Sequence, residues 1–215
     1  MRNHEFIRIF VLLGIAIVSS GCASHRGPAW LARAEKQSNK WGYYSGYVEA
    51  RWENDGRNMT LLRELRYTDP QGVTWVAPAG SVVDGASIPR SLWSIMGGPF
   101  EGKYRNASVL HDVAYDQHTR PWQQCDRMFY HAMRCSGVSA AEAGTMYYAL
   151  YKLGRHWKFP KAEPVKVGDE IVARGEEVRR ATPVNATQIN ETRDWIRNND
   201  PTLDQIEQRA NSERR

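Results

Sequence analysis

The chain has 215 residues, of which 41% are hydrophobic and 25% are charged, and its formal net charge at pH 7 is +5. This composition excludes wholesale disorder, and the mean hydropathy of −0.61 excludes a multi-pass membrane protein. Three cysteines are too few for a disulfide-rich scaffold, and the length suits one domain with additional segments at its ends.

Residues 1–21 have the anatomy of an export signal. Arginines near the start are followed by an apolar run of ten residues from Ile9 to Val18. A run of this length is typical of a signal peptide and is short for a membrane span. Small residues then lead to Cys22, which resembles the lipobox of bacterial lipoproteins, although Ser19 stands where leucine is usual.

The lipobox resemblance implies that Cys22 is lipidated and begins the mature chain, with residues 22–41 as a tether to the membrane. Ala23 follows the cysteine, where an aspartate would suggest retention in the inner membrane. We therefore expect an exported protein anchored in the outer membrane and facing the periplasm, with no nucleic-acid partner. Ordinary cleavage nearby, with Cys22 left unmodified, is the alternative.

Residues 42–157 are expected to form an α+β body. Its first part is rich in aromatic and alternating apolar residues, and turn signals at Asn54–Gly56 and Asp69–Gly72 separate the expected strands. The pattern predicts a small antiparallel β meander. From about residue 105 the spacing of apolar residues becomes helical.

Three helices are predicted after the meander, over residues 105–117, 121–135 and 139–156. Ser139 and Glu142 have the spacing of a capping box, which supports the start of the third helix. The predicted fold is therefore a small sheet followed by a three-helix core.

Residues 158–215 read as a charged linker and a C-terminal helical tail. Ile189, Ile196 and Leu203 recur every seven residues, and Pro201 interrupts this pattern. The favoured interpretation is a solvated helix that packs loosely on the body or is partly disordered. The alternative is a helix that docks on a partner or on the cell wall.

One group of residues could carry chemistry. His111 and Tyr115 form an H-D-x-x-Y pattern and share one helix face, and C-D-x-x-F follows with Asp126 on the next helix. A turn between the two helices would bring Asp126 beside His111. His111 would then deprotonate water, Asp126 would orient the imidazole and stabilise its charged form, and Tyr115 would hold Asp126.

A hard cation such as calcium could complete this site. Asp112 points about 100° away from His111 around the helix and offers oxygen ligands. Gly97 and Gly98 lie in an upstream loop, where glycines would let backbone carbonyls converge on the same ion. A zinc site is a weaker alternative, and its ligands would be His111, Asp112, His118 and His131.

Two other interpretations stay open. His111, Tyr115 and Asp126 could instead be a structural polar network that satisfies itself in a helical core. Asp84 and Ser87 belong to the block D-G-A-S-I-P-R, which is most simply a turn. Asp84 could also be a ligand at the His111 site, or Ser87 a nucleophile with His111 as its base.

The helical half, residues 97–155, resembles the phospholipase A2 superfamily in its small prokaryotic and viral branches. The resemblance implies that His111 is the base, Asp112 a calcium ligand, Tyr115 a support and Asp126 the partner of His111. The disulfides and the C-G-x-G calcium loop of that superfamily are missing here.

A second resemblance is closer and covers about residues 45–157. The block Val83–Arg90, Trp93, the H-D-x-x-Y pattern and the C-D-x-x-F pattern together resemble a domain-of-unknown-function family of bacteria and phages. Two functions follow as expectations. One is an esterase or phospholipase-like hydrolase, with calcium as its cofactor and a lipid or ester substrate. The other is a non-catalytic envelope or phage-related lipoprotein that binds an envelope protein.

The lipoprotein interpretation predicts the mass of the mature protein. The intact chain should begin at Cys22 and carry diacylglycerol, and a Cys22→Ser variant should lack that mass because it has no thiol to modify. Mass spectrometry of the purified protein measures both. A mature wild-type chain that begins elsewhere with a free thiol would refute the interpretation.

Overall fold

The computed structural model describes residues 40–85, 93, 97–98, 100–159, 166–167, 170–171, 175–179 and 185–213. The expected signal, nearly all of the tether with Cys22, and Ser87 lie outside these residues. Among the described helices, none combines the length and apolar character that crossing a membrane requires.

Two small antiparallel sheets form the first part of the body. The first sheet has the order β1-β4-β5, with bounds Tyr43–Ser45, Leu65–Thr68 and Thr74–Ala77. The second has the order β2-β3-β6, with bounds Ala50–Trp52, Met59–Leu61 and Val82–Val83. The α+β class is confirmed, but the six strands are divided between two sheets instead of forming one continuous meander.

Both predicted turns join neighbouring strands. The Gly56 N–H donates to the Glu53 carbonyl at 3.1 Å, and the Gly72 N–H donates to the Asp69 carbonyl at 2.9 Å. Each glycine has a positive φ, of 67° and 81°, which is why a glycine suits these positions. The turn residues therefore set the register of the two hairpins.

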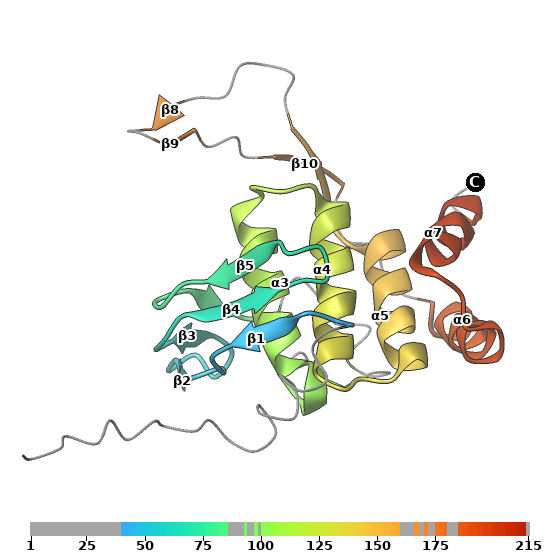
Figure 1. Ribbon diagram of the computed structural model, residues 1–215, viewed down its shortest axis with the longest axis horizontal. Helices are drawn as coiled ribbons and strands as arrows, with labels where there is room; N and C mark the ends of the chain where they lie inside the picture. Colours follow the sequence, from blue (N-terminus) through green and yellow to red (C-terminus); the bar gives the residue numbers. More distant parts are fainter. Residues whose placement is uncertain are drawn as a thin grey trace, which may run out of the picture.

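Three helices pack beside the sheets (Figure 1). A short 3-10 helix, η1 (Gly102–Tyr104), leads into α3 (Arg105–Gln117), α4 (Trp122–Cys135) and α5 (Ala140–Leu153). The first two helices begin and end within one residue of their predicted bounds. The Ser139 side chain accepts the Glu142 N–H at 3.1 Å, so this residue caps α5 as expected.

The third helix ends three residues earlier than predicted. Gly154 adopts an extended conformation, and His156 enters strand β7 (His156–Lys158), which pairs with β10 (Glu176–Arg179). Strands β8 (Lys166–Val167) and β9 (Glu170–Ile171) form a separate pair. The helical spacing of apolar residues continues past Leu153, so the sequence pattern predicts a longer helix. The helix ends because the backbone becomes extended at Gly154.

His118, one of the possible zinc ligands, is buried at the end of α3. Its ring stacks on Trp157 with centroids 4.3 Å apart, and its carbonyl accepts the Gly175 N–H at 2.8 Å. A Cβ at Gly175 would lie 2.0 Å from Trp157 Cδ1, so only glycine fits at this position. Gly175, directly before β10, thus packs against the end of α3.

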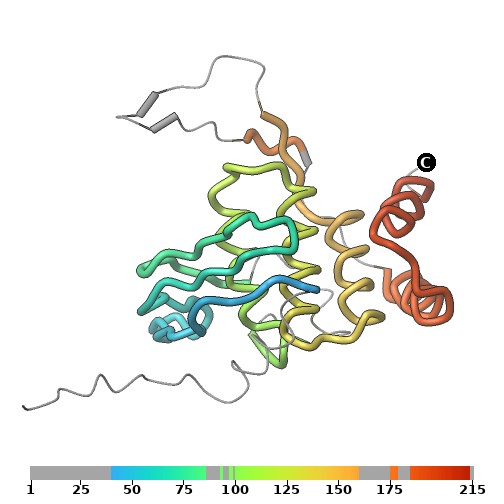
Figure 2. The backbone as a smooth tube through the Cα atoms, viewed as in Figure 1, coloured from blue at the N-terminus to red at the C-terminus, as the bar shows by residue number. Residues whose placement is uncertain are grey.

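The C-terminal tail consists of two docked helices that cross instead of packing side by side, and we call residues 185–213 the C-terminal hairpin. Helices α6 (Ala186–Asn199) and α7 (Leu203–Ser212) lie against α5, on the side away from the sheets (Figure 2). Ile189, Ile196 and Ile206 are buried, and Pro201 separates the two helices. For residues 185–213 the expectation of loose packing or partial disorder is therefore wrong.

Glu213 joins this hairpin to α5. Its Oε2 accepts hydrogen bonds from Tyr148 Oη and from Lys152 Nζ, the latter at 2.7 Å. Burial alone would raise the pKa of Glu213, but these two hydrogen bonds and the charges of Lys152 and Arg209 outweigh it and hold the pKa below its ordinary value of 4.5.

A Glu213→Gln variant should therefore lose stability that depends on pH. A carboxyl with a depressed folded-state pKa stabilises the fold above its unfolded pKa, and this contribution disappears as the pH falls through the folded value. The urea midpoint of the variant should lie below that of the wild type at pH 7, and the gap should shrink below about pH 4.5. Glu191→Gln, at an exposed position of α6, is the control. A gap that does not change with pH would contradict this account.

Candidate functional site

Three buried polar side chains meet between α3 and α4. His111 Nε2 lies 2.9 Å from Asp126 Oδ1, and the Tyr115 hydroxyl donates to the same oxygen at 2.5 Å. Each of the three residues has an exposed fraction of 0%. The predicted contact between the two helices is confirmed, and the catalytic roles assigned to these residues stay predictions.

Aromatic rings fix the position of the imidazole. The His111 ring lies with its centroid 4.1 Å from that of Tyr115 and 4.7 Å from that of Phe129. Trp157 packs edge-on against Tyr115, with centroids 4.9 Å apart. These contacts leave the imidazole little rotational freedom, so its Nε2 stays directed at Asp126.

Burial controls the protonation of Asp126. It raises the pKa of this carboxyl, while the hydrogen bond and charge of His111 and the hydrogen bond of Tyr115 act against that rise. Burial and the neighbouring Asp126 also raise the pKa of Tyr115 well above its ordinary value, which keeps its hydroxyl protonated as a donor.

The second oxygen of this carboxyl is also buried. Asp126 Oδ2 has no hydrogen-bond partner among the residues that the structure describes. Because an isolated buried carboxylate is strongly unfavourable, the charge of Asp126 depends on the two donors at Oδ1. His111 and Asp126 therefore form one buried, hydrogen-bonded pair.

Asp112 binds the backbone of the turn that follows strand β6. Its Oδ2 accepts the backbone N–H groups of Asp84 at 2.9 Å and of Gly85 at 3.0 Å. Gly85 has a φ of +70°, and the Asp84 carboxylate pairs with Arg57. The interpretation of this block as a turn is thus supported, and the turn is attached to the helix residue that follows His111.

The glycine loop has polar partners of its own. The Gly98 carbonyl accepts the Tyr104 hydroxyl at 2.9 Å, and the Gly98 N–H donates to Glu101 at 3.2 Å. Gly97 has a φ of +91°. Within the described part of the chain, no group of three or more His, Cys, Asp or Glu side chains is placed to hold a metal ion. Calcium binding stays a prediction.

Several contacts of the site have no signal in the sequence. Arg57 is 27 residues from Asp84, and Arg155 lies with its guanidinium carbon 5.8 Å from the Tyr115 ring. Neither belongs to a motif or to a helical repeat. Trp157 could have been suspected only as one more aromatic residue of the core.

Replacing Asp112 should loosen the turn without touching His111. Asp112→Ala removes two charge-assisted hydrogen bonds and leaves two N–H groups unsatisfied, so we expect a loss of about 2–4 kcal/mol in the free energy of unfolding. Asp112→Asn keeps an acceptor and should lose less. Gln117→Ala, on the exposed end of the same helix, is the control. Chemical denaturation measures all three, and an Asp112→Ala variant as stable as the control would refute this role.

Part of the chain, including the site, is similar to known proteins. Residues 59–150 match the family described as "Protein of unknown function (DUF1353)". "Uncharacterized protein y4jT" of Sinorhizobium fredii (strain NBRC 101917 / NGR234) is 44% identical over 97 residues, which are 45% of this chain and 29% of that protein. "Uncharacterized protein y4iH" of the same strain is 36% identical over 105 residues, which are 49% of this chain and 44% of that protein.

The chain thus spans less than half the length of either relative. No solved structure matches it significantly. The matched segment includes α3, α4 and most of α5, and hence the meeting point of His111, Tyr115 and Asp126. The family model that residues 59–150 match describes proteins whose function is unknown.

Proposed function

We propose that the body of this protein is a hydrolase for carboxylic esters, with His111 as its general base. The observation that carries the proposal is the hydrogen bond of 2.9 Å between His111 Nε2 and Asp126 Oδ1, reinforced by Tyr115 at the same oxygen. An imidazole held by a buried carboxylate has the orientation and the charge stabilisation that water activation requires.

The roles of the two ring nitrogens follow from this bond. Because Nε2 faces Asp126, Nδ1 of His111 is the nitrogen that would take a proton from water. The resulting hydroxide would add to the ester carbonyl carbon, and the bond to the leaving oxygen would break. The imidazolium would return its proton to that leaving oxygen, so the carboxylic acid and the alcohol leave and His111 is restored.

The expected export and lipid anchor suggest a class of substrate. A body joined to a membrane through Cys22 would meet phospholipid esters at high local concentration, so we propose lipid esters at the periplasmic face of the outer membrane as substrates. Calcium binding by Asp112 needs a test of its own, because Asp112 Oδ2 already accepts two N–H groups. If Asp112 is a calcium ligand, added calcium should raise hydrolysis in the wild type and not in Asp112→Asn.

The decisive experiment compares variants of the pair on ester substrates. The full chain is assayed on p-nitrophenyl esters of short and long acids and on phosphatidylethanolamine vesicles. His111→Ala and Asp126→Asn should lose about 100-fold or more in rate, because each removes the activated base. Tyr115→Phe should lose less, because it keeps the base and its partner.

His131→Asn is the matched control, a histidine of α4 outside the network. Its activity should equal that of the wild type, and circular dichroism should show that every variant is folded. Turnover retained in folded His111→Ala would defeat the mechanism.

Complete burial favours a second candidate function. His111, Tyr115 and Asp126 expose no surface, as expected for a structural network in a non-catalytic lipoprotein that binds an envelope partner. On this alternative no ester is hydrolysed by the wild type, and His111→Gln still crosslinks to the same envelope protein. The ester assay therefore separates the two candidates.

A further inference from the structure

A set of hydrogen-bond donors on α4 and α5 is covered by the chain's own C-terminal hairpin. Its members are Arg127, Tyr147, Tyr148 and Lys152, and we call them the donor surface. The hairpin consists of residues 185–213 and lies outside the matched family segment, which ends at residue 150.

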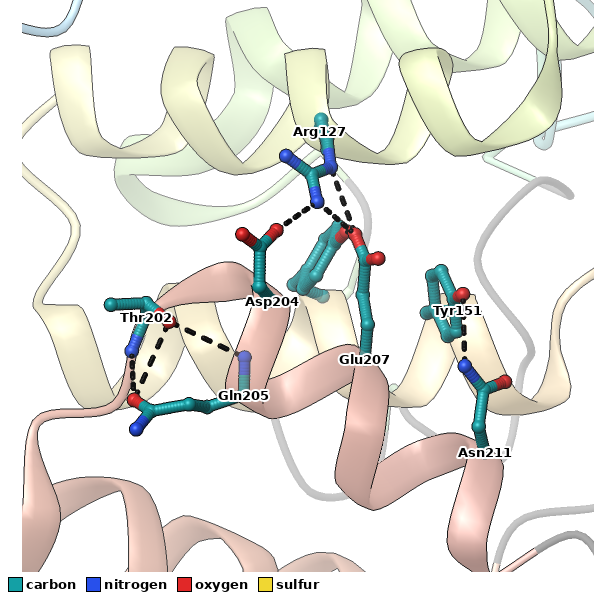
Figure 3. Close-up of polar contacts among 8 residues, drawn as sticks. Arg127, Tyr151, Thr202, Asp204, Gln205, Glu207 and Asn211 are labelled. Carbon is teal, nitrogen blue, oxygen red and sulfur yellow. Dashed lines mark hydrogen bonds and ion pairs between the residues drawn. The ribbon is translucent and has the colours of Figure 1, made fainter.

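The first half of this contact is centred on Arg127. Its Nε donates to Glu207 Oε1 at 2.8 Å, and its Nη2 reaches both Glu207 and Asp204. Figure 3 shows Arg127 extending from α4 to these two carboxylates of α7. Tyr147 donates its hydroxyl to the same Glu207 oxygen. One carboxylate of the hairpin thus satisfies two donors of the body.

The second half lies two turns further along α7. Glu213 accepts hydrogen bonds from Tyr148 and Lys152, which are one turn apart on α5. In these contacts every donor belongs to the body, and every acceptor is a carboxylate of the hairpin. The donor surface therefore binds carboxylates on both sides of the α7 axis, since Asp204 and Glu213 are about 180° apart around a helix.

Apolar contacts set how closely the hairpin approaches. Gly144 of α5 faces two isoleucines, and a Cβ there would lie 3.2 Å from Ile196 Cγ2 and 3.4 Å from Ile206 Cδ1. Because Ile196 belongs to α6 and Ile206 to α7, the glycine makes room for both helices against α5. The helix with the carboxylates is α7, in which the buried Ile206 and Ala210 lie between the acidic side chains around the helix axis.

The contacts that hold the hairpin differ in exposure. The Arg127 and Asp204 side chains are 40% and 72% exposed, and ion pairs with that much solvent contact contribute little to stability. Glu207 and Lys152 are 18% and 8% exposed, so a competing segment must replace these contacts as well as the buried isoleucines. It must also compete with the covalent connection, which gives the hairpin an effective concentration on the order of millimolar.

We propose that the donor surface is a docking site for an acidic amphipathic helix of a partner protein, and that the C-terminal hairpin occupies this site in the absence of that partner. The charge complementarity of the resident hairpin defines the chemistry of the partner. Carboxylates lie at the positions of Asp204, Glu207 and Glu213, with an apolar residue at the position of Ile206. The proposal is independent of ester hydrolysis.

The test uses the full-length protein and a fluorescent peptide with the sequence of residues 185–213. In one variant, Glu207→Arg with Glu213→Arg, the resident hairpin is repelled while the donor surface stays intact. The peptide should bind this variant at least about 100-fold more tightly than the wild type, because the tethered competitor is lost. A peptide carrying Glu207→Gln and Glu213→Gln is the control and should bind at least about tenfold more weakly.

A second peptide tests whether the chemistry alone suffices. It keeps Ile189, Ile196, Asp204, Ile206, Glu207, Ala210 and Glu213 in an otherwise unrelated helical sequence, and it should bind within about tenfold of the native peptide. Adding Arg127→Glu to the charge-reversed variant should abolish binding of both peptides.

Four results would overturn the proposal. One is a folded, charge-reversed variant with its hairpin released, as limited proteolysis would show, that binds neither peptide. Another is binding of the native peptide alone, since the surface would then be specific for the chain's own tail. A third is binding of the native peptide to the wild type as tightly as to the charge-reversed variant. The fourth is loss of the whole fold in the charge-reversed variant.

Discussion

The fold is organised around one buried carboxylate. Asp126 lies in the interface between α3 and α4 with no exposed surface, and its Oδ1 accepts hydrogen bonds from His111 and Tyr115. A carboxylate in such surroundings is tolerable only while both donors are in place, so the two helices cannot slide or rotate without exposing an unpaired polar group. The interaction that holds the helices in register is thus the same one that could activate a water molecule.

The remaining polar contacts attach other segments to this helical pair. Asp112, next to His111, binds the backbone of the turn at Asp84 and Gly85, which fixes the end of strand β6 to α3. Arg127, next to Asp126, binds the C-terminal hairpin through Glu207. The residues that follow His111 and Asp126 in the sequence therefore connect the helical pair to the sheet and to the hairpin.

Local patterns in the sequence predicted part of this arrangement. The spacing of His111, Tyr115 and Asp126 and the capping residue Ser139 depend on helical geometry, which the sequence records directly. The contacts of Asp112 and Arg127 reach residues 28 and 80 positions away, at the backbone of Asp84 and at Glu207. Because these contacts depend on tertiary packing, one sequence could show that Asp112 and Glu207 are acidic but not what they bind.

A double-mutant cycle on His111 and Asp126 tests the central claim most directly. The variants His111→Phe, Asp126→Leu and their combination are compared by chemical denaturation, with side chains chosen to fill similar space. If the buried pair holds α3 and α4 together, each single variant leaves a polar partner unsatisfied. The double variant should then lose less free energy of unfolding than the two single losses add up to, by about 1.5 kcal/mol or more. Losses that add to within about 0.5 kcal/mol would show that the two residues act independently and would contradict the account.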